Sequence, residues 1–295
     1  KYGQNNIFYL SAHKNHFNNA LQDYNIKIND LKTEISYFGF RLWHFLSSKR
    51  KLLSKNSIEK FDLIIDLQSK LRNTLILKQI PNRHFYSSTL NFKFCSTHKD
   101  YISTKYDNNN IILNLEKLLN DKIVFRKYDT DLIDNKYFTE AKRLLPDRNY
   151  IGFSITQGNA YRKKSWPIEK FLSVANKILK QNKIPVFFIE RNNIDLINKI
   201  KNEIQNVLIP ELDSNLSGPP LVTALSKRLE KAISIDNGIM HMIGLANIPM
   251  TVLFGPTNSK KFSPKIKNIN ILDSKILYNS DEISKIKEED VLNLI

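Results

Sequence analysis

The second half of the chain alternates apolar runs of strand length with amphipathic runs of helix length, and this alternation constrains the fold more than any other feature. The apolar runs are residues 150–155, 184–190, 207–212, 232–236 and 249–255. The amphipathic runs between them are residues 166–182, 192–204, 220–231 and 238–247. Strands that are apolar on both faces and joined by helices are typical of a parallel sheet with helices on each side. We therefore predict an α/β fold with a doubly wound sheet for this half.

The first half of the chain carries weaker signals of the same kind. The predicted strands are residues 7–10, 61–67 and 84–88, and the predicted helices are residues 69–81 and 111–120. A chain of 295 residues exceeds the usual size of one domain, and a polar stretch separates the two halves. We place the boundary between Asp134 and Arg148 and predict two Rossmann-like domains, at 1–140 and 141–295.

The composition excludes several classes of protein. The sequence has no run of 18 apolar residues, so no membrane-spanning helix is predicted, and its beginning lacks the pattern of a signal peptide. The single cysteine, Cys95, excludes an intrachain disulfide and fits a reducing cytoplasm. We interpret it as a surface or half-buried thiol. We predict no metal site, because metal-ligand spacing is absent among His13, His16, His84 and His98.

The formal net charge of +16 has two interpretations. It favours anionic partners, such as phosphorylated substrates or an anionic membrane face. Alternatively, it reflects a bias of the whole genome towards Lys, Asn and Ile. Because no basic run is interleaved with aromatic residues, we predict no nucleic-acid partner.

Polar residues and glycines follow four of the predicted strands in the second half. They are Thr156, Gln157 and Lys164 after the first strand, Glu190 after the second, Asp236, Asn237 and Gly238 after the fourth, and Gly255 and Thr257 after the fifth. Ligands of open parallel sheets bind at the carboxyl ends of the strands. We therefore predict that these residues converge on one crevice, and that the crevice binds a nucleotide diphosphate.

Each of the main candidates has a predicted role. The helix that opens at Gly238 presents backbone N–H groups and a positive dipole end to a phosphate, and glycine permits a close approach. Asp236 is expected to shape that turn, and His241 to donate to a phosphate oxygen. Lys164 is expected to neutralise the charge of the diphosphate, and Glu190 to accept from ribose hydroxyls.

Ordinary structural alternatives stand beside these roles. Asp236 fits a helix N-cap, and His241 fits a half-buried histidine. Glu190 fits a solvated strand end, Lys164 an exposed lysine, and Gly255 a turn. The sequence contains neither G-x-x-x-x-G-K-[ST] nor G-x-G-x-x-G, which disfavours a P-loop or a hydride-transfer cofactor.

Three blocks of sequence resemble the heptosyltransferases, glycosyltransferase family nine. "SIDNGIMHMIGLANIPMTVLFGPTN" at 234–258 is similar to the family's C-terminal signature. "KKSWPIEKFLSVANKIL" at 163–179 resembles its K-R-W-P-x-E motif, and "FDLIIDLQSKLRNTLI" at 61–76 resembles a segment of its first domain. The blocks follow the family's order.

The resemblance implies a GT-B architecture, with two Rossmann-like domains facing across a cleft. The C-terminal domain would bind a nucleotide sugar, typically ADP-heptose, and the N-terminal domain a lipopolysaccharide-core or related glycolipid acceptor. The enzyme would invert the anomeric centre without a metal or a cofactor, with Lys164 as a catalytic group. It would act as a monomer in the cytoplasm, peripheral to the inner, anionic face of the cytoplasmic membrane. The alternative is a catalytically silent nucleotide-sugar-binding protein of the same fold.

The chain departs from the family pattern at several positions. Asn237 stands where Ser or Thr is usual. The segment from Asn5 resembles the second strand of the family's first domain, so we expect the first strand, and the aspartate that serves there as base, upstream of Lys1. Asp66, at a strand end, is the fallback base, and its alternative is to cap the following helix. The aromatic stretch 37–45 fits either a core helix or a helix that faces the acceptor or the membrane.

Overall fold

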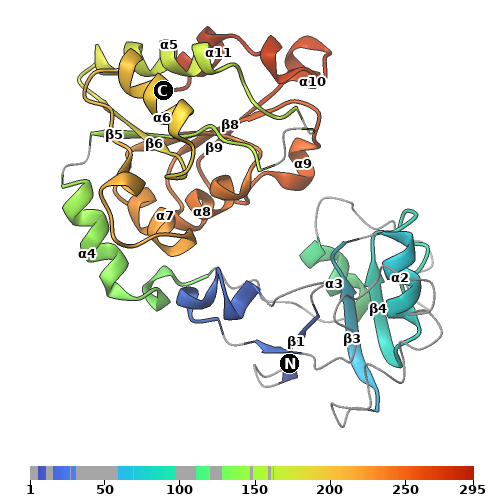
Figure 1. Cartoon of the computed structure of the whole chain (residues 1–295). Coiled ribbons are helices and arrows are strands. Elements are labelled where there is room, and N and C mark those ends of the chain that lie inside the picture. Colours follow the sequence, from blue (N-terminus) through green and yellow to red (C-terminus); the bar gives the residue numbers. More distant parts are fainter. Residues whose placement is uncertain are drawn as a thin grey trace. The chain divides into compact units, whose positions relative to one another are not determined.

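The computed structural model of the chain describes residues 6–10, 16–26, 28–30, 59–68, 70–96, 111–119, 128–146, 149–158, 161 and 163–295. The chain forms two compact units (Figure 1). One comprises Lys1–Gln22 with Ile26–Lys127, and the other comprises Asp23–Asn25 with Tyr128–Ile295. The aromatic stretch 37–45 lies outside the described residues, so both interpretations of it stay open.

The second unit is built on a five-stranded, all-parallel sheet with the order β6-β5-β7-β8-β9. Its strands are β5 (Tyr150–Ser154), β6 (Ile184–Phe188), β7 (Lys231–Ile235), β8 (Met250–Phe254) and β9 (Ile269–Asp273). Residues of β5 and β8 are buried along their whole length, which explains why these strands read as continuous apolar runs. The prediction of a doubly wound parallel sheet is confirmed.

Helices cover both faces of this sheet (Figure 1). The α-helices are α4 (Asn135–Leu144), α5 (Ile168–Leu179), α6 (Ile194–Glu203), α7 (Pro219–Ser226), α8 (Gly238–Ala246), α9 (Ser259–Phe262), α10 (Ser274–Tyr278) and α11 (Glu288–Leu292). The 3-10 helices are η5 (Thr130–Leu132), η7 (Pro210–Leu212) and η8 (Ile283–Lys285). Apolar side chains of α5, α6 and α11 share one core cluster with the strands, where the rings of Phe153 and Phe187 stack with centroids 4.7 Å apart.

Two predictions for this unit need correction. The run 207–212 is not a strand, because only Leu208 pairs with the sheet, through one bridge to Val186, and η7 follows directly. The boundary between the units falls at Lys127, earlier than the expected position near 140. The reason is α4, which buries Tyr137 and Ala141 and packs against α7.

The first unit contains two short parallel pairs of strands within its described residues. They are β1 (Phe8–Tyr9) with β2 (Asn29–Asp30), and β3 (Phe61–Asp66) with β4 (Asn82–Ser87). Its helices are α2 (Leu71–Lys78), α3 (Ile111–Leu119), the 3-10 helix η2 (His16–Asn18) and part of η3 (Gln22–Tyr24). The run β3-α2-β4 is the strand–helix–strand unit that the sequence predicted. None of the helices in the described part of the chain has both the length and the hydropathy that a membrane crossing needs.

Candidate functional site

A pocket of about 440 Å³ lies beside the carboxyl ends of β5, β7 and β8. Its lining residues are Gln157, Gly158, Lys164, Asp236, Asn237, Gly238, His241, Thr257 and Phe262. Because the strands are parallel and adjacent, the loops that follow them open on the same edge of the sheet. The structure therefore brings together most of the residues that the sequence placed at the strand ends.

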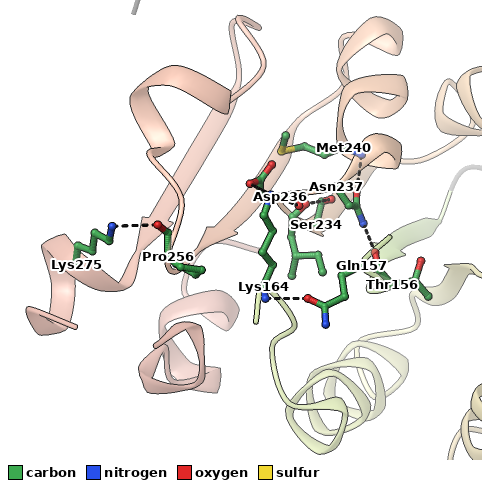
Figure 2. A network of polar contacts seen from close by, with 10 residues as sticks. Thr156, Gln157, Lys164, Ser234, Asp236, Asn237, Met240, Pro256 and Lys275 are labelled. Carbon is green, nitrogen blue, oxygen red and sulfur yellow. Dashed lines mark hydrogen bonds and ion pairs between the residues drawn. The ribbon is translucent and has the colours of Figure 1, made fainter. Parts of the chain in front are cut away.

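Lys164 and Asp236 form an ion pair in this pocket (Figure 2). Their side chains are only 12% and 8% exposed, so water screens the pair weakly. The main-chain N–H of Lys164 donates to the side-chain oxygen of Gln157 over 2.8 Å, which fixes the loop that carries the lysine. Lys164 is therefore not an ordinary exposed lysine. The pocket holds a buried cation whose charge is balanced by a carboxylate.

Asn237 joins the end of β5 to the start of α8. Its Oδ1 accepts from the backbone N–H of Met240 over 2.9 Å, so Asn237, and not Asp236, is the N-cap of α8. Its Nδ2 donates to Ser154 Oγ over 2.7 Å. It also donates to the carbonyl oxygen of Thr156 over 2.8 Å (Figure 2). A Ser or Thr cap has no amide to make these donations. The contribution of Thr156 is thus a main-chain carbonyl that positions Asn237, and Thr156 does not line the pocket.

The three glycines of the 238–255 window serve different purposes. A Cβ on Gly255 would lie 2.8 Å from Ile283 Cβ and 2.9 Å from the Ile283 nitrogen, so packing against η8 requires glycine there. A Cβ on Gly244 would lie 2.9 Å from Pro264 Cβ. A Cβ on Gly238 would meet nothing within 4 Å. Gly255 does not line the pocket and has a packing role, so its ligand contact stays a prediction, whereas Gly238 lines the pocket.

His241 lies one turn into α8 and lines the same pocket. His241 is exposed at the pocket, and partial desolvation there lowers its pKa below the ordinary value. Asp236 opposes this shift and Lys164 adds to it. The imidazole is therefore neutral near pH 7 in the free protein, with one N–H available as a donor.

The segment that follows β8 supplies a hydroxyl and an aromatic ring to the pocket. The Oγ1 of Thr257 is buried and has no hydrogen-bond partner in the described part of the protein. The ring of Phe262, at the end of α9, also lines the pocket. Sequence reasoning missed Phe262, because a helix of four residues leaves no periodic pattern. Its one signal was an aromatic residue shortly after the Gly255–Thr257 turn.

The sequence comparison decides the family of this chain. The model of Glycosyltransferase family 9 (heptosyltransferase) matches residues 49–292. The chain belongs to glycosyltransferase family 9. No curated protein matches this family 9 chain at a significant level.

Solved structures share the fold of this family 9 protein at low sequence identity. A family 9 glycosyl transferase from Veillonella parvula aligns with a TM-score of 0.64 and 19% identity, covering 94% of this chain and 84% of that one. The E. coli heptosyltransferase WaaC with ADP aligns with a TM-score of 0.55 and 14% identity, covering 86% and 78%. E. coli ADP-heptose lps heptosyltransferase II aligns with a TM-score of 0.54 and 15% identity, covering 93% and 84%. The predicted α/β fold class is confirmed, and it matches that of GT-B heptosyltransferase structures.

Glu190 lies apart from the pocket of this family 9 chain. It is exposed, follows β6, and is not among the residues that line the pocket. Its carbonyl oxygen accepts from the N–H of Asn193 over 3.0 Å, just before α6 begins. Because β6 is next to β5, Glu190 lies beyond the Gln157 end of the pocket. A contact with ribose stays a prediction.

Asp66 is buried in the first unit, at the end of β3. Its carboxylate accepts from Thr74 Oγ1 over 2.6 Å, from Ser87 Oγ over 2.9 Å and from the N–H of Gln68 over 3.0 Å. The N-cap residue of α2 is Lys70, so Asp66 does not occupy the cap position. These hydrogen bonds tie β3 to α2 and β4. This arrangement argues against the role of general base that we assigned to it as a fallback.

The described residues contain no group of three or more His, Cys, Asp or Glu side chains that could hold a metal ion. The positive groups of the pocket are instead Lys164 and the first turn of α8. The thiol of Cys95 is buried and donates to the carbonyl oxygen of Ser87, and burial raises its pKa. The thiol is more buried than the surface or half-buried position that the sequence predicted, and its environment is that of a structural thiol.

Proposed function

We propose that the chain is an inverting glycosyltransferase that binds a nucleotide sugar in this pocket. The donor is ADP-heptose, and the acceptor is a lipopolysaccharide-core or related glycolipid. The observation that carries the proposal is the buried Lys164–Asp236 pair next to the open space at Gly238, in a chain of family 9. The names of two structural neighbours, WaaC with ADP and ADP-heptose lps heptosyltransferase II, support the choice of nucleotide.

Several pocket residues are placed to bind different parts of a diphosphate. The first N–H groups of α8 have no partner within the helix, and the helix dipole favours negative charge at this end. Gly238 leaves room for a phosphate oxygen to reach these N–H groups. His241 offers an N–H one turn further on, and Lys164 offers a charge that Asp236 already orients.

In the proposed reaction, these residues stabilise the negative charge of the leaving group. The acceptor hydroxyl attacks the anomeric carbon of the sugar, and the bond from that carbon to the diphosphate oxygen breaks on the opposite face. The proton of the hydroxyl passes to a general base, which the family resemblance puts on the first strand of the fold. Lys164 and the start of α8 stabilise the diphosphate as its negative charge grows, so the proposal requires no metal.

The proposed site of action is the inner face of the cytoplasmic membrane. A glycolipid acceptor is held in that membrane, so the enzyme has to work at its surface. The net charge of +16 favours attraction to an anionic leaflet. Co-sedimentation with anionic vesicles that declines as salt rises is the expected behaviour.

Replacing Lys164 with alanine tests the proposal. We expect the affinity for ADP to fall about 10- to 100-fold, because a hydrogen bond to a charged group contributes roughly 1.5–3 kcal/mol. Isothermal titration calorimetry measures the change. The matched control is Lys163→Ala, since Lys163 is exposed and does not line the pocket. Equal ADP affinity in the Lys164 variant and the wild type would contradict the proposal.

His241 gives the proposed site a pH dependence. The pKa of His241 is below its ordinary value in the free protein, and a bound diphosphate favours the protonated ring. Binding therefore takes up a proton, and ADP affinity is expected to rise as the pH falls from 8 to 6. The phosphate of ADP titrates in the same range, so His241→Gln serves as the reference that retains the ligand's own titration. Calorimetry over this range should give a shallower pH slope for the variant, and identical slopes would remove His241 from the phosphate site.

A further inference from the structure

The pocket has a charged part and a neutral end. The charged part follows β5 and β7 and contains Lys164, Asp236 and the start of α8. The neutral end follows β8 and consists of Thr257 and Phe262. Because β7 lies between β5 and β8 in the sheet, a diphosphate at the start of α8 lies between Gln157 and the neutral end. The two ends of the pocket therefore offer two directions in which the ends of a nucleotide sugar can extend.

The hydroxyl of Thr257 is an unsatisfied group in this neutral end. Thr257 is one of the residues that line the pocket. Its Oγ1 is buried and has no hydrogen-bond partner in the part of the protein that the structure describes. A buried hydroxyl without a partner costs free energy, roughly 1–3 kcal/mol. A ligand that offers a hydroxyl at this point would remove that cost. Thr257 therefore marks a place where a polar ligand group belongs.

Phe262 is held in a fixed position beside Thr257. The short helix α9 is capped by Asn258, whose Oδ1 accepts from the N–H of Lys261 over 3.1 Å. At its start, the buried Ser259 Oγ donates to Asp273 Oδ2 over 2.6 Å, which ties α9 to the end of β9. Phe262 is 39% exposed, so part of its ring is open to a ligand. Its exposed surface faces the pocket that it lines.

We propose that Thr257 and Phe262 form the subsite for the transferred sugar. The inference rests on the proposed function and states which end of the pocket holds the sugar of the donor and which end holds its nucleoside. A pyranose presents hydroxyls along its rim and C–H bonds on its face, which match a hydroxyl beside an aromatic ring. The nucleoside then extends past Gln157 towards β6. Phe262 and Thr257 are specificity residues for the sugar and not for the nucleotide.

The experiment compares two ligands, ADP and ADP-heptose, in the variants Phe262→Ala and Thr257→Val. We expect ADP affinity to stay within about 2-fold of wild type for both variants. We expect ADP-heptose affinity to fall about 10-fold for Phe262→Ala and about 5-fold for Thr257→Val. The matched control is Ile276→Ala, because Ile276 is a large apolar residue that is 72% exposed and does not line the pocket. Phe262→Tyr keeps the ring and should bind ADP-heptose like the wild type.

Each other outcome overturns the subsite in a recognisable way. An equal loss for ADP and ADP-heptose would place Phe262 at the nucleobase. No loss for either ligand would show that the neutral end is unused. In both cases wild-type binding of ADP leaves the proposed function intact. Wild-type protein that binds neither ligand would remove the proposed function and the subsite together.

Discussion

Gly238→Ala is expected to weaken ADP binding about 100-fold without lowering the stability of the fold. A Cβ on Gly238 meets no protein atom within 4 Å, so the folded chain accommodates the methyl group. The methyl group would occupy the space through which a phosphate reaches the first N–H groups of α8. Losing two charge-assisted hydrogen bonds of roughly 1.5 kcal/mol each corresponds to about 100-fold in affinity. Calorimetric titration with ADP and a thermal melt of the free protein measure the two quantities.

Gly255→Ala is the matched control for this prediction. The same methyl group on Gly255 would lie 3.0 Å from the Asp281 carbonyl oxygen and closer still to Ile283, so backbone has to move. Overpacking of this kind typically costs about 1–3 kcal/mol, and the melting temperature should fall. The two variants therefore separate a ligand requirement from a packing requirement. ADP affinity that is unchanged in Gly238→Ala would show that no phosphate binds at the start of α8.

The sequence predicted four of the five strands of the second unit's sheet and missed β9. The runs that became β5 and β8 are apolar throughout because each strand lies inside the sheet. β9 (Ile269–Asp273) is an edge strand whose first three residues are only partly buried or exposed, so it lacks such a run. The run 207–212 has the composition of a strand, yet Pro210 begins a 3-10 helix after a single bridge. Composition alone does not distinguish these cases.

The candidate site was predictable to the extent that strand order determines it. Lys164, Asp236 and His241 follow or flank strand ends, and a parallel sheet brings such ends to one edge. The hydrogen bonds from Asn237 to β5 and the loop after it were not predictable, because they depend on Ser154 and Thr156, which lie at the end of the neighbouring strand. Their positions relative to Asn237 are a property of the register and not of the local sequence.

The glycines illustrate the same limit. Gly238 and Gly255 follow neighbouring strands in the same way, and the sequence assigned both to the ligand. The structure separates them through the segment at Ile283, which packs on Gly255 and leaves Gly238 open. A contact between residues that are almost 30 positions apart decides which glycine serves the pocket. Only the tertiary structure contains that information.

Trp166→Ala is expected to lower the free energy of unfolding of the second unit by about 4 kcal/mol. Trp166 is only 2% exposed, and its ring meets that of Phe171 edge to face with centroids 4.8 Å apart. Removing a buried Trp side chain typically costs about 3–5 kcal/mol, because the neighbours close the cavity only in part. The indole N–H also donates to the carbonyl oxygen of Ile286 over 2.9 Å, and this buried acceptor would lose that bond.

The Trp166→Ala substitution is also expected to affect the pocket, because Trp166 follows Lys164 by two residues. Without the ring, the loop loses the hydrogen bond from Trp166 to Ile286, and we expect the ammonium group of Lys164 to be held less firmly near Asp236. We expect urea unfolding to show the loss of stability and calorimetry to show weaker ADP binding in the same variant. Trp166→Phe keeps most of the packing, so its loss should be much smaller. Tyr161→Ala is the exposed control, at 96% exposure, and should change neither quantity. A Trp166→Ala variant as stable as the Tyr161→Ala control would contradict the anchoring role of the tryptophan.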